Sequence, residues 1–127
     1  MRRWILLPAL LILASCSLNV PPDSASADDV LAAYLRALRS GDCSTTHALA
    51  IGTLGPDNGD LCGRVRVNAA RVEGRPVELH AGELTYMTTI NVTGADESMY
   101  QGDNTWFYSL AQQPSGAWRL VSGGSGP

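Results

Sequence analysis

The sequence predicts an α+β fold, in which N-terminal helices pack on a curved, mostly antiparallel sheet of about four strands. The chain of 127 residues is long enough for one hydrophobic core. Apolar residues first recur at intervals of three and four positions, the spacing of one helix face, and from Arg64 onward at every second position, the spacing of half-buried strands. Because the helices come first and the strands follow as a block, we expect one helical layer on one sheet.

The first helix is expected to begin after Ser26, whose hydroxyl can cap free backbone N–H groups. Asp28 and Asp29 then lie in the first turn, where negative charge is favoured. Gly41 suits the left-handed conformation that ends a helix. The residues predicted to form its buried face are Val30, Leu31, Tyr34, Leu35 and Leu38.

A second helix is expected from Cys43 to about Ile51, because Asp42 can cap it. The two helices would form a hairpin. A loop rich in Gly, Pro, Asp and Asn follows over 52–60, and the tripeptide at 61–63 is expected to form one short turn.

Strands are predicted wherever apolar and polar residues alternate. The pattern occurs at 65–67, at 84–93 and at 106–110. Pro114-Ser115-Gly116 then predicts a turn into a last strand over 117–121, so the final two strands should form a hairpin.

The N-terminus combines positive charge, an apolar run and a cysteine in a fixed order. Arg2 and Arg3 precede the apolar run Trp4–Leu13, and Leu-Ala-Ser-Cys at 13–16 follows. This run is too short to span a bilayer, which needs ~20 residues. The pattern resembles the lipobox of bacterial lipoproteins, which implies that Cys16 receives diacylglycerol, with acyl chains such as palmitate, and becomes the first mature residue. We therefore expect a lipid-anchored protein at the extracytoplasmic face of the cell membrane.

Three regions follow from this interpretation. Residues 1–15 are the signal peptide, and 16–27 are the lipidated cysteine and a flexible tether, since small polar residues surround a Pro-Pro pair there. Residues 28–127 form the soluble domain, and the glycine- and serine-rich end from Ser122 to Pro127 is expected to be a frayed terminus.

Charge excludes nucleic acid as a partner. The formal net charge is −3, and removal of Arg2 and Arg3 leaves seven arginines against twelve carboxylates, a net charge of −5. Binding to phosphates needs clustered positive charge, which this chain lacks. Its nine basic residues are all arginine, which is typical of a GC-rich, actinobacterial genome.

Several short motifs together resemble a known superfamily. They are Tyr34 in the first helix, Gly41-Asp42-Cys43, Leu61-Cys62-Gly63, Thr105-Trp106 and Trp118-Arg119-Leu120-Val121. In these motifs the chain resembles small actinobacterial lipoproteins of the nuclear transport factor 2-like (NTF2-like, SnoaL-like) superfamily. The resemblance implies a cone of helices and curved sheet, often a homodimer through the sheet, and often a pocket at the mouth of the cone. It implies no single activity, because the superfamily includes isomerases, dehydratases and binding modules.

Once Cys16 carries lipid, Cys43 and Cys62 remain as an even pair outside the cytoplasm, where disulfides persist. We expect them to be bonded, with two buried free thiols as the alternative. His47 and His80 lack the spacing of a metal site, so no metal and no cofactor are expected. His47 would act as a base only if it faced a pocket near Asp42.

No catalytic residue is assigned, because the apolar strand face carries no carboxylate. Aromatic residues are the candidates for a ligand pocket, with a filled core as the alternative: Tyr34, Tyr86, Trp106, Tyr108 and Trp118. The function predicted first is non-enzymatic binding of a small hydrophobic ligand or an envelope protein. The alternatives are an enzyme of the isomerase or dehydratase kind, using His47 or Tyr34, and an accessory subunit of an envelope complex.

Replacing the cysteine of the lipobox tests the anchor. We expect Cys16→Ala to abolish incorporation of labelled fatty acid, because the thiol that accepts diacylglycerol is gone, and to leave an uncleaved or soluble product. Metabolic labelling and electrophoresis measure both effects. A Cys16→Ala protein that still carries lipid would contradict the anchoring.

Overall fold

The computed structural model describes residues 19–52, 54, 59–96 and 99–126. Its elements in chain order are α1 (Ala27–Ser40), α2 (Cys43–Leu49), β1 (Arg66–His80), β2 (Glu83–Thr93), β3 (Gly102–Gln112) and β4 (Trp118–Gly124). The four strands form one antiparallel sheet in the order β1-β2-β3-β4. The predicted α+β class, with helices followed by an antiparallel sheet, is confirmed.

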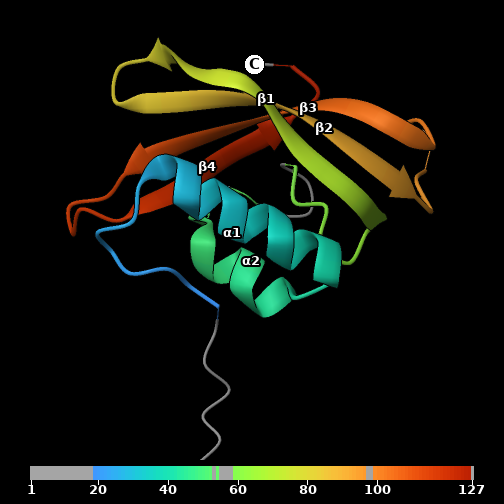
Figure 1. The fold of residues 1–127 in the computed structure, drawn as a ribbon, viewed down its shortest axis with the longest axis horizontal. Coiled ribbons are helices and arrows are strands. Elements are labelled where there is room, and N and C mark those ends of the chain that lie inside the picture. The colour runs from blue at the N-terminus through green and yellow to red at the C-terminus, as the bar shows by residue number, and fades with distance from the viewer. Residues whose placement is uncertain (1–18, 53, 55–58, 97–98, 127) are drawn as a thin grey trace, which may run out of the picture.

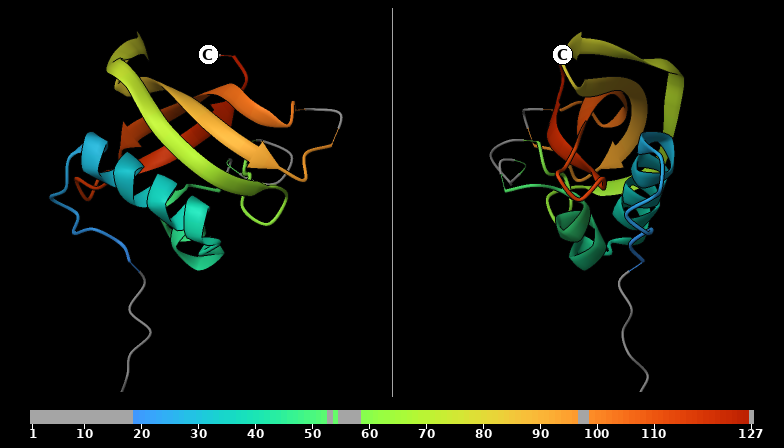
Figure 2. Two further views of the ribbon diagram at one scale, coloured as in Figure 1. Left: turned by 45° about the vertical axis from the view of Figure 1, so that its right-hand side comes forward. Right: turned by 90° about the vertical axis from the view of Figure 1, so that its left-hand side faces the viewer.

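Both helices lie on the same side of the sheet, and the sheet curls around the core between them (Figures 1 and 2). The inner face of the sheet carries Tyr86, Ile90, Tyr108 and Leu120, all nearly inaccessible to solvent. These residues pack with the buried face of α1 in a single hydrophobic cluster. One face of the sheet is therefore covered, and among the described residues no helix covers the opposite face, here called the outer face.

Helix α1 forms where its sequence predicts it. The hydroxyl of Ser26 accepts a hydrogen bond from the Asp29 N–H at 3.2 Å, which satisfies one free donor of the first turn. At the other end Gly41 takes the left-handed conformation, with φ of 72°, and its N–H bonds back to the last turn. All five apolar residues predicted for the inward face are buried.

Helix α2 ends two residues earlier than predicted. Its last residue is Leu49, and Ala50 is extended, with φ of −108° and ψ of 145°. Ala50 forms a parallel bridge with Leu120, and the Ile51 N–H donates to the Leu120 carbonyl at 2.9 Å. Pairing with β4 thus supplies these backbone groups with partners that another helical turn would have provided.

Strand β1 is far longer than the predicted strand at 65–67. It begins at Arg66 and runs for 15 residues to His80. Its pairing with β2 is irregular between Val67 and Ala69 and again between Glu73 and Val77. Each irregularity shifts which side chains face the core. The sequence of β1 therefore lacks the alternation of apolar and polar residues that predicts a strand, although the strand forms at the edge of the sheet.

The predicted frayed tail is wrong for Ser122 to Gly124, which belong to β4. Gly123 pairs with Tyr108, and Gly124 with Phe107. A Cβ atom on Gly123 would lie 2.9 Å from Cε1 of Tyr108, and one on Gly59 would lie 1.8 Å from the Gly123 carbonyl oxygen. Glycine at these positions lets two backbone segments and a buried ring approach more closely than any side chain allows.

The expected tether is partly packed. Residues 19–26 form no helix or strand, yet Val20 and Ala25 are partly buried against the core. Packing therefore begins several residues before 28, where the domain was expected to start. The signal peptide and Cys16 lie outside the described residues. Within the described ranges, neither helix is long and apolar enough to cross a bilayer.

Substitution of Gly123 tests whether the glycine-rich end is packed. We expect Gly123→Ala to lower the free energy of unfolding by about 1–3 kcal/mol, because its methyl group meets the ring of Tyr108. Gly124→Ala is the matched control, since its methyl group would lie 3.9 Å from the Gly126 carbonyl oxygen, an ordinary contact, and should change stability by less than about 0.5 kcal/mol. Urea unfolding measures both. Equal effects of the two variants would contradict the packed strand.

Candidate functional site

The aromatic residues expected to line a pocket are packed side chains of the core. Tyr34, Tyr86, Trp106 and Tyr108 are buried, and Trp118 is partly buried against the same cluster. The rings of Tyr34 and Tyr108 meet edge to face with centroids 5.3 Å apart. The structure thus brings helix α1 and strand β3 together through these rings.

One of these residues borders a small hollow at the start of α1. Tyr86 lies beside this space of about 210 Å³, together with Leu31 and Val72. Its hydroxyl donates a hydrogen bond to Oδ1 of Asp28. Burial, and then the bond to Asp28, raise the pKa of Tyr86 well above its ordinary value, so the ring is neutral at physiological pH.

Two hydroxyls lie deep in the interior. Those of Tyr34 and Tyr108 find no hydrogen-bond partner of good geometry among the described residues. Burial is the largest cause that raises the pKa of each. The negative charge of Asp60 adds to it at Tyr34, whereas at Tyr108 the neighbouring Tyr34 adds more than Asp60 does. Both tyrosines are therefore neutral groups near a buried carboxylate.

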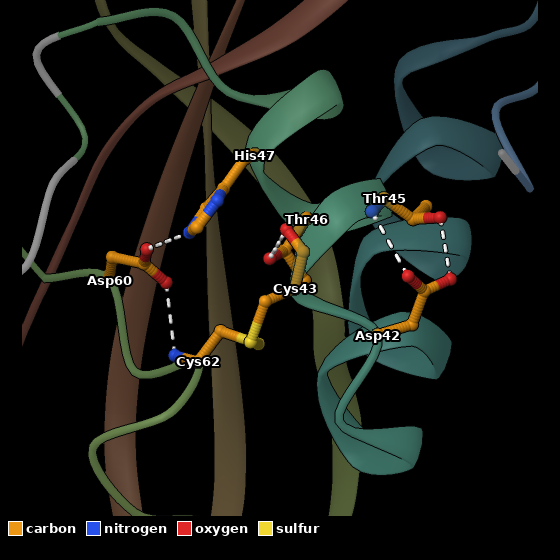
Figure 3. Close-up of polar contacts among 7 residues, drawn as sticks. All are labelled: Asp42, Cys43, Thr45, Thr46, His47, Asp60 and Cys62. Atoms are coloured by element: carbon orange, nitrogen blue, oxygen red, sulfur yellow. Dashed lines mark hydrogen bonds and ion pairs between the residues drawn. A yellow bond between two sulfur atoms is a disulfide. The ribbon is translucent and has the colours of Figure 1, made fainter.

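Asp60 is the centre of a polar junction between α2 and the chain before β1 (Figure 3). Its Oδ2 lies 3.0 Å from Nε2 of His47, and its Oδ1 accepts the Cys62 N–H at 3.0 Å. The carboxylate is almost completely buried, whereas the His47 side chain is 62% exposed. The predicted disulfide between Cys43 and Cys62 is confirmed, with Cα atoms 5.6 Å apart. One covalent and one polar link thus fasten this segment to α2, and the bond from the Cys62 N–H fixes the Asp60 carboxylate within the segment.

The structure pairs His47 with Asp60 and not with Asp42. Asp42 caps α2 instead: its carboxylate accepts the N–H of Thr45 at 3.2 Å and the Thr45 hydroxyl at 2.6 Å (Figure 3). These hydrogen bonds lower the pKa of Asp42. Asp60 was missed because it ends the loop predicted over 52–60, whose composition gives no indication of burial. The signal available was its position two residues before Cys62, where an aspartate can accept that backbone N–H.

A second candidate lies on the outer face of the sheet. Met87 pairs with Glu73 on one side and with Phe107 on the other, so these side chains share the outer face. Val77 pairs with Thr85 on the same face. We call the apolar residues here the outer-face patch, and they are Val77, Leu79, Met87 and Phe107.

The outer-face patch is open to solvent. The exposed fractions are 56% for Val77, 49% for Leu79 and 43% for Met87. The patch surrounds a hollow of about 310 Å³, to which Glu73, Arg75 and Thr85 also contribute. Beneath it the hydroxyls of Thr85 and Ser109 are buried and bond to each other at 2.8 Å. Because each of these two hydroxyls already has the other as its hydrogen-bond partner, a group that fills the hollow need not be polar.

A polar strip continues from the patch along the same face. Glu73 accepts hydrogen bonds from Nε of Arg71 and, at 2.9 Å, from the hydroxyl of Thr89. These bonds lower the pKa of Glu73, so it is ionised at neutral pH. Farther along, Asn91 bonds to Asn68 and Asp103. The outer face thus divides into an apolar part near the β1–β2 hairpin and a polar part beyond it.

The sequence did not reveal the outer-face patch, because it arises from strand pairing. Met87 was placed on the polar side of β2, and Val77 and Leu79 were not recognised as strand residues. In the residues that the structure describes, no group of three or more His, Cys, Asp or Glu side chains could hold a metal ion.

Comparisons with models of protein families, with curated proteins and with solved structures found no match to this chain. The function has to be inferred from the residues and their geometry.

Removal of the buried carboxylate tests its role. We expect Asp60→Ala to lower the free energy of unfolding by about 1–3 kcal/mol, because the partly buried N–H of Cys62 loses its acceptor. Asp60→Asn keeps an amide oxygen that can accept the same N–H, so it should lower the free energy of unfolding by less than Asp60→Ala does. His47→Ala removes only an exposed partner, so we expect a loss below about 1 kcal/mol. Urea unfolding measures all three, and a loss in His47→Ala equal to that in Asp60→Ala would contradict a structural role centred on Cys62.

Proposed function

We propose that this chain is an envelope lipoprotein, held at the extracytoplasmic face of the cell membrane by lipid on Cys16, whose domain binds an apolar partner without catalysis. The observation that carries the binding function is the outer-face patch. The pattern at residues 1–16 supports the location.

Exposure of the patch has a cost that binding would remove. Val77, Leu79 and Met87 are each about half exposed, although all three are aliphatic. Full burial of such a side chain contributes about 1.5–3 kcal/mol, so covering these three would contribute on the order of 1 kcal/mol each. Grouped apolar side chains with a polar border are typical of interaction sites.

The shape of the patch favours a protein over a small ligand. Its hollow of about 310 Å³ is at the lower limit of ligand sites, which range over ~300–1,000 Å³. Its walls are themselves exposed, so they would enclose little of a small molecule. One or two apolar side chains of an envelope protein would fit the hollow, and Glu73 and Arg75 would provide a polar rim. A small hydrophobic ligand is the alternative occupant, and a second copy of the chain, forming a homodimer, is another.

We also propose that the domain has the NTF2-like cone. Support comes from the resemblance in the motifs around Tyr34, Cys43, Cys62 and Trp118, and from a helical layer that precedes an antiparallel sheet. In such a cone the interior is the usual ligand space. In this chain Tyr34 and Tyr108 occupy that side of the sheet, which favours use of the outer face.

An acid–base enzyme is the second candidate function. It is favoured by His47, whose exposed imidazole is held at 3.0 Å by the buried carboxylate of Asp60. A carboxylate fixes the orientation of a catalytic histidine in the same way. This function would require a substrate that reaches the exposed side of His47. An accessory subunit of an envelope complex is one form of the first proposal, because such a subunit would bind its partner protein through the outer-face patch.

Native mass spectrometry of the protein purified from membranes in mild detergent tests the binding function. We expect a bound protein, a second copy or an apolar molecule on the native chain, and at least a roughly tenfold loss in Met87→Asp, because a charge in an apolar contact must be desolvated. Tyr100→Asp is the matched control, since Tyr100 is 83% exposed and lies off the patch, and should keep the complex. A native chain that carries nothing, or a complex that survives Met87→Asp, would contradict the proposal.

A further inference from the structure

We propose that the domain is held directly against the membrane, with the α2 end of the helical layer toward the lipid and the outer-face patch directed away from it. This inference rests on the proposed lipidation of Cys16. It concerns an interaction surface, the membrane-proximal end of the domain, whose partner is the lipid surface.

The chain becomes part of the domain at Asn19. Its N–H donates a hydrogen bond to Oγ1 of Thr45 at 3.3 Å. Thr45 is fully buried, and its hydroxyl donates to Asp42 at 2.6 Å, so the acceptor is itself fixed. Asn19 is therefore held at the beginning of α2.

The following residues remain on the domain surface. Val20 and Ala25 pack against the core, and the Ala25 N–H donates to the Pro22 carbonyl at 2.9 Å, which closes a turn. Asp23 lies 3.8 Å from the guanidinium of Arg119 on β4. A hydrogen bond at Asn19, apolar packing at Val20 and Ala25, and the ion pair of Asp23 thus hold 19–26 against the domain, so these residues do not serve as a spacer.

Chain length then limits the distance to the lipid. Only Ser17 and Leu18 separate Cys16 from Asn19. Three residue steps span at most about 10 Å. A free tether over 16–27 would instead reach about 40 Å and let the domain rotate. Asn19 must therefore lie within about 10 Å of a cysteine whose acyl chains are in the bilayer.

The direction in which the chain leaves determines the orientation. In all the views the described chain begins on the helical side, and the β1–β2 hairpin lies at the opposite end of the domain (Figures 1 and 2). Ser40 and Asp42 border the same surface groove as Asn19. The end of α1 and the start of α2 therefore approach the lipid, whereas the hairpin that carries Val77 and Leu79 is far from it.

Charge is compatible with this orientation. Helix α2 consists of Cys-Ser-Thr-Thr-His-Ala-Leu and contains no Asp, Glu, Lys or Arg. The mature domain has a net charge of −5, which an anionic membrane surface repels. At this end the charge of Arg39 in the last turn of α1 is opposite to that of Asp42, which caps α2. An end without excess negative charge approaches such a surface at a lower electrostatic cost than the rest of the domain.

Energy transfer to the membrane surface tests the orientation. The donor is a maleimide dye on a cysteine introduced into the full lipidated protein. One variant is Ser40→Cys, at the end expected to face the lipid. The matched distal variant is Ala81→Cys, in the exposed turn of the β1–β2 hairpin. No native thiol competes, because Cys16 is a thioether and Cys43 is bonded to Cys62. The acceptor is a headgroup-labelled lipid in phosphatidylcholine vesicles that contain phosphatidylglycerol. We expect several-fold higher transfer from position 40 than from position 81.

A lengthened chain is the control. An insertion of about ten Gly and Ser residues after Ser17 adds a flexible reach of about 17 Å, so the difference between the two positions should largely disappear. Equal transfer from positions 40 and 81 in the lipidated native chain overturns the orientation alone. The intact mass and flotation with vesicles report the lipid separately. An unlipidated Cys16 overturns the anchoring, and this inference with it.

Discussion

Two helices of 14 and seven residues can cover only one face of a four-stranded sheet. This constraint determines where the apolar side chains of the domain can be buried. On the inner face α1 lies against β3 through the rings of Tyr34 and Tyr108, and the space is filled by large side chains. Neither helix of the described part of the chain lies on the outer face, so that face is polar, as around Asn91, or keeps apolar groups exposed, as at Val77 and Met87.

The short length of the helices also explains why α2 is fastened by several links. A helix of seven residues buries little surface and would be marginal alone. It is held by the disulfide between Cys43 and Cys62, by the His47–Asp60 contact, and by pairing of Ala50 with Leu120. In the chain-entropy model a disulfide across a separation of 19 residues contributes about 3 kcal/mol. These links replace hydrophobic area that a small domain lacks.

Local signals in the sequence predicted local features well. Ser26 and Gly41 mark the ends of α1 because capping involves neighbouring residues, and the even pair of cysteines predicted the disulfide. Features that depend on distant contacts were missed. Gly123 appeared to belong to a flexible tail, although its lack of a side chain is what lets Tyr108 pack beside it. Asp60 lies in a loop whose composition says nothing of burial, and the bulges of β1 removed the alternation that would have revealed Val77.

The packed segment 19–26 links the proposed anchor to the proposed binding surface. Proline and small polar residues ordinarily predict a flexible tether, but Val20 and Ala25 find apolar contacts, and Asp23 lies near the guanidinium of Arg119 on β4. A flexible tether would let the patch face the lipid part of the time, where exposed apolar side chains could insert into the bilayer. A short connection at the helical side prevents this by geometry. In the proposed arrangement the apolar patch is thereby kept available for an envelope protein, and helix α2, which contains no Asp, Glu, Lys or Arg, is the element that must tolerate the membrane surface.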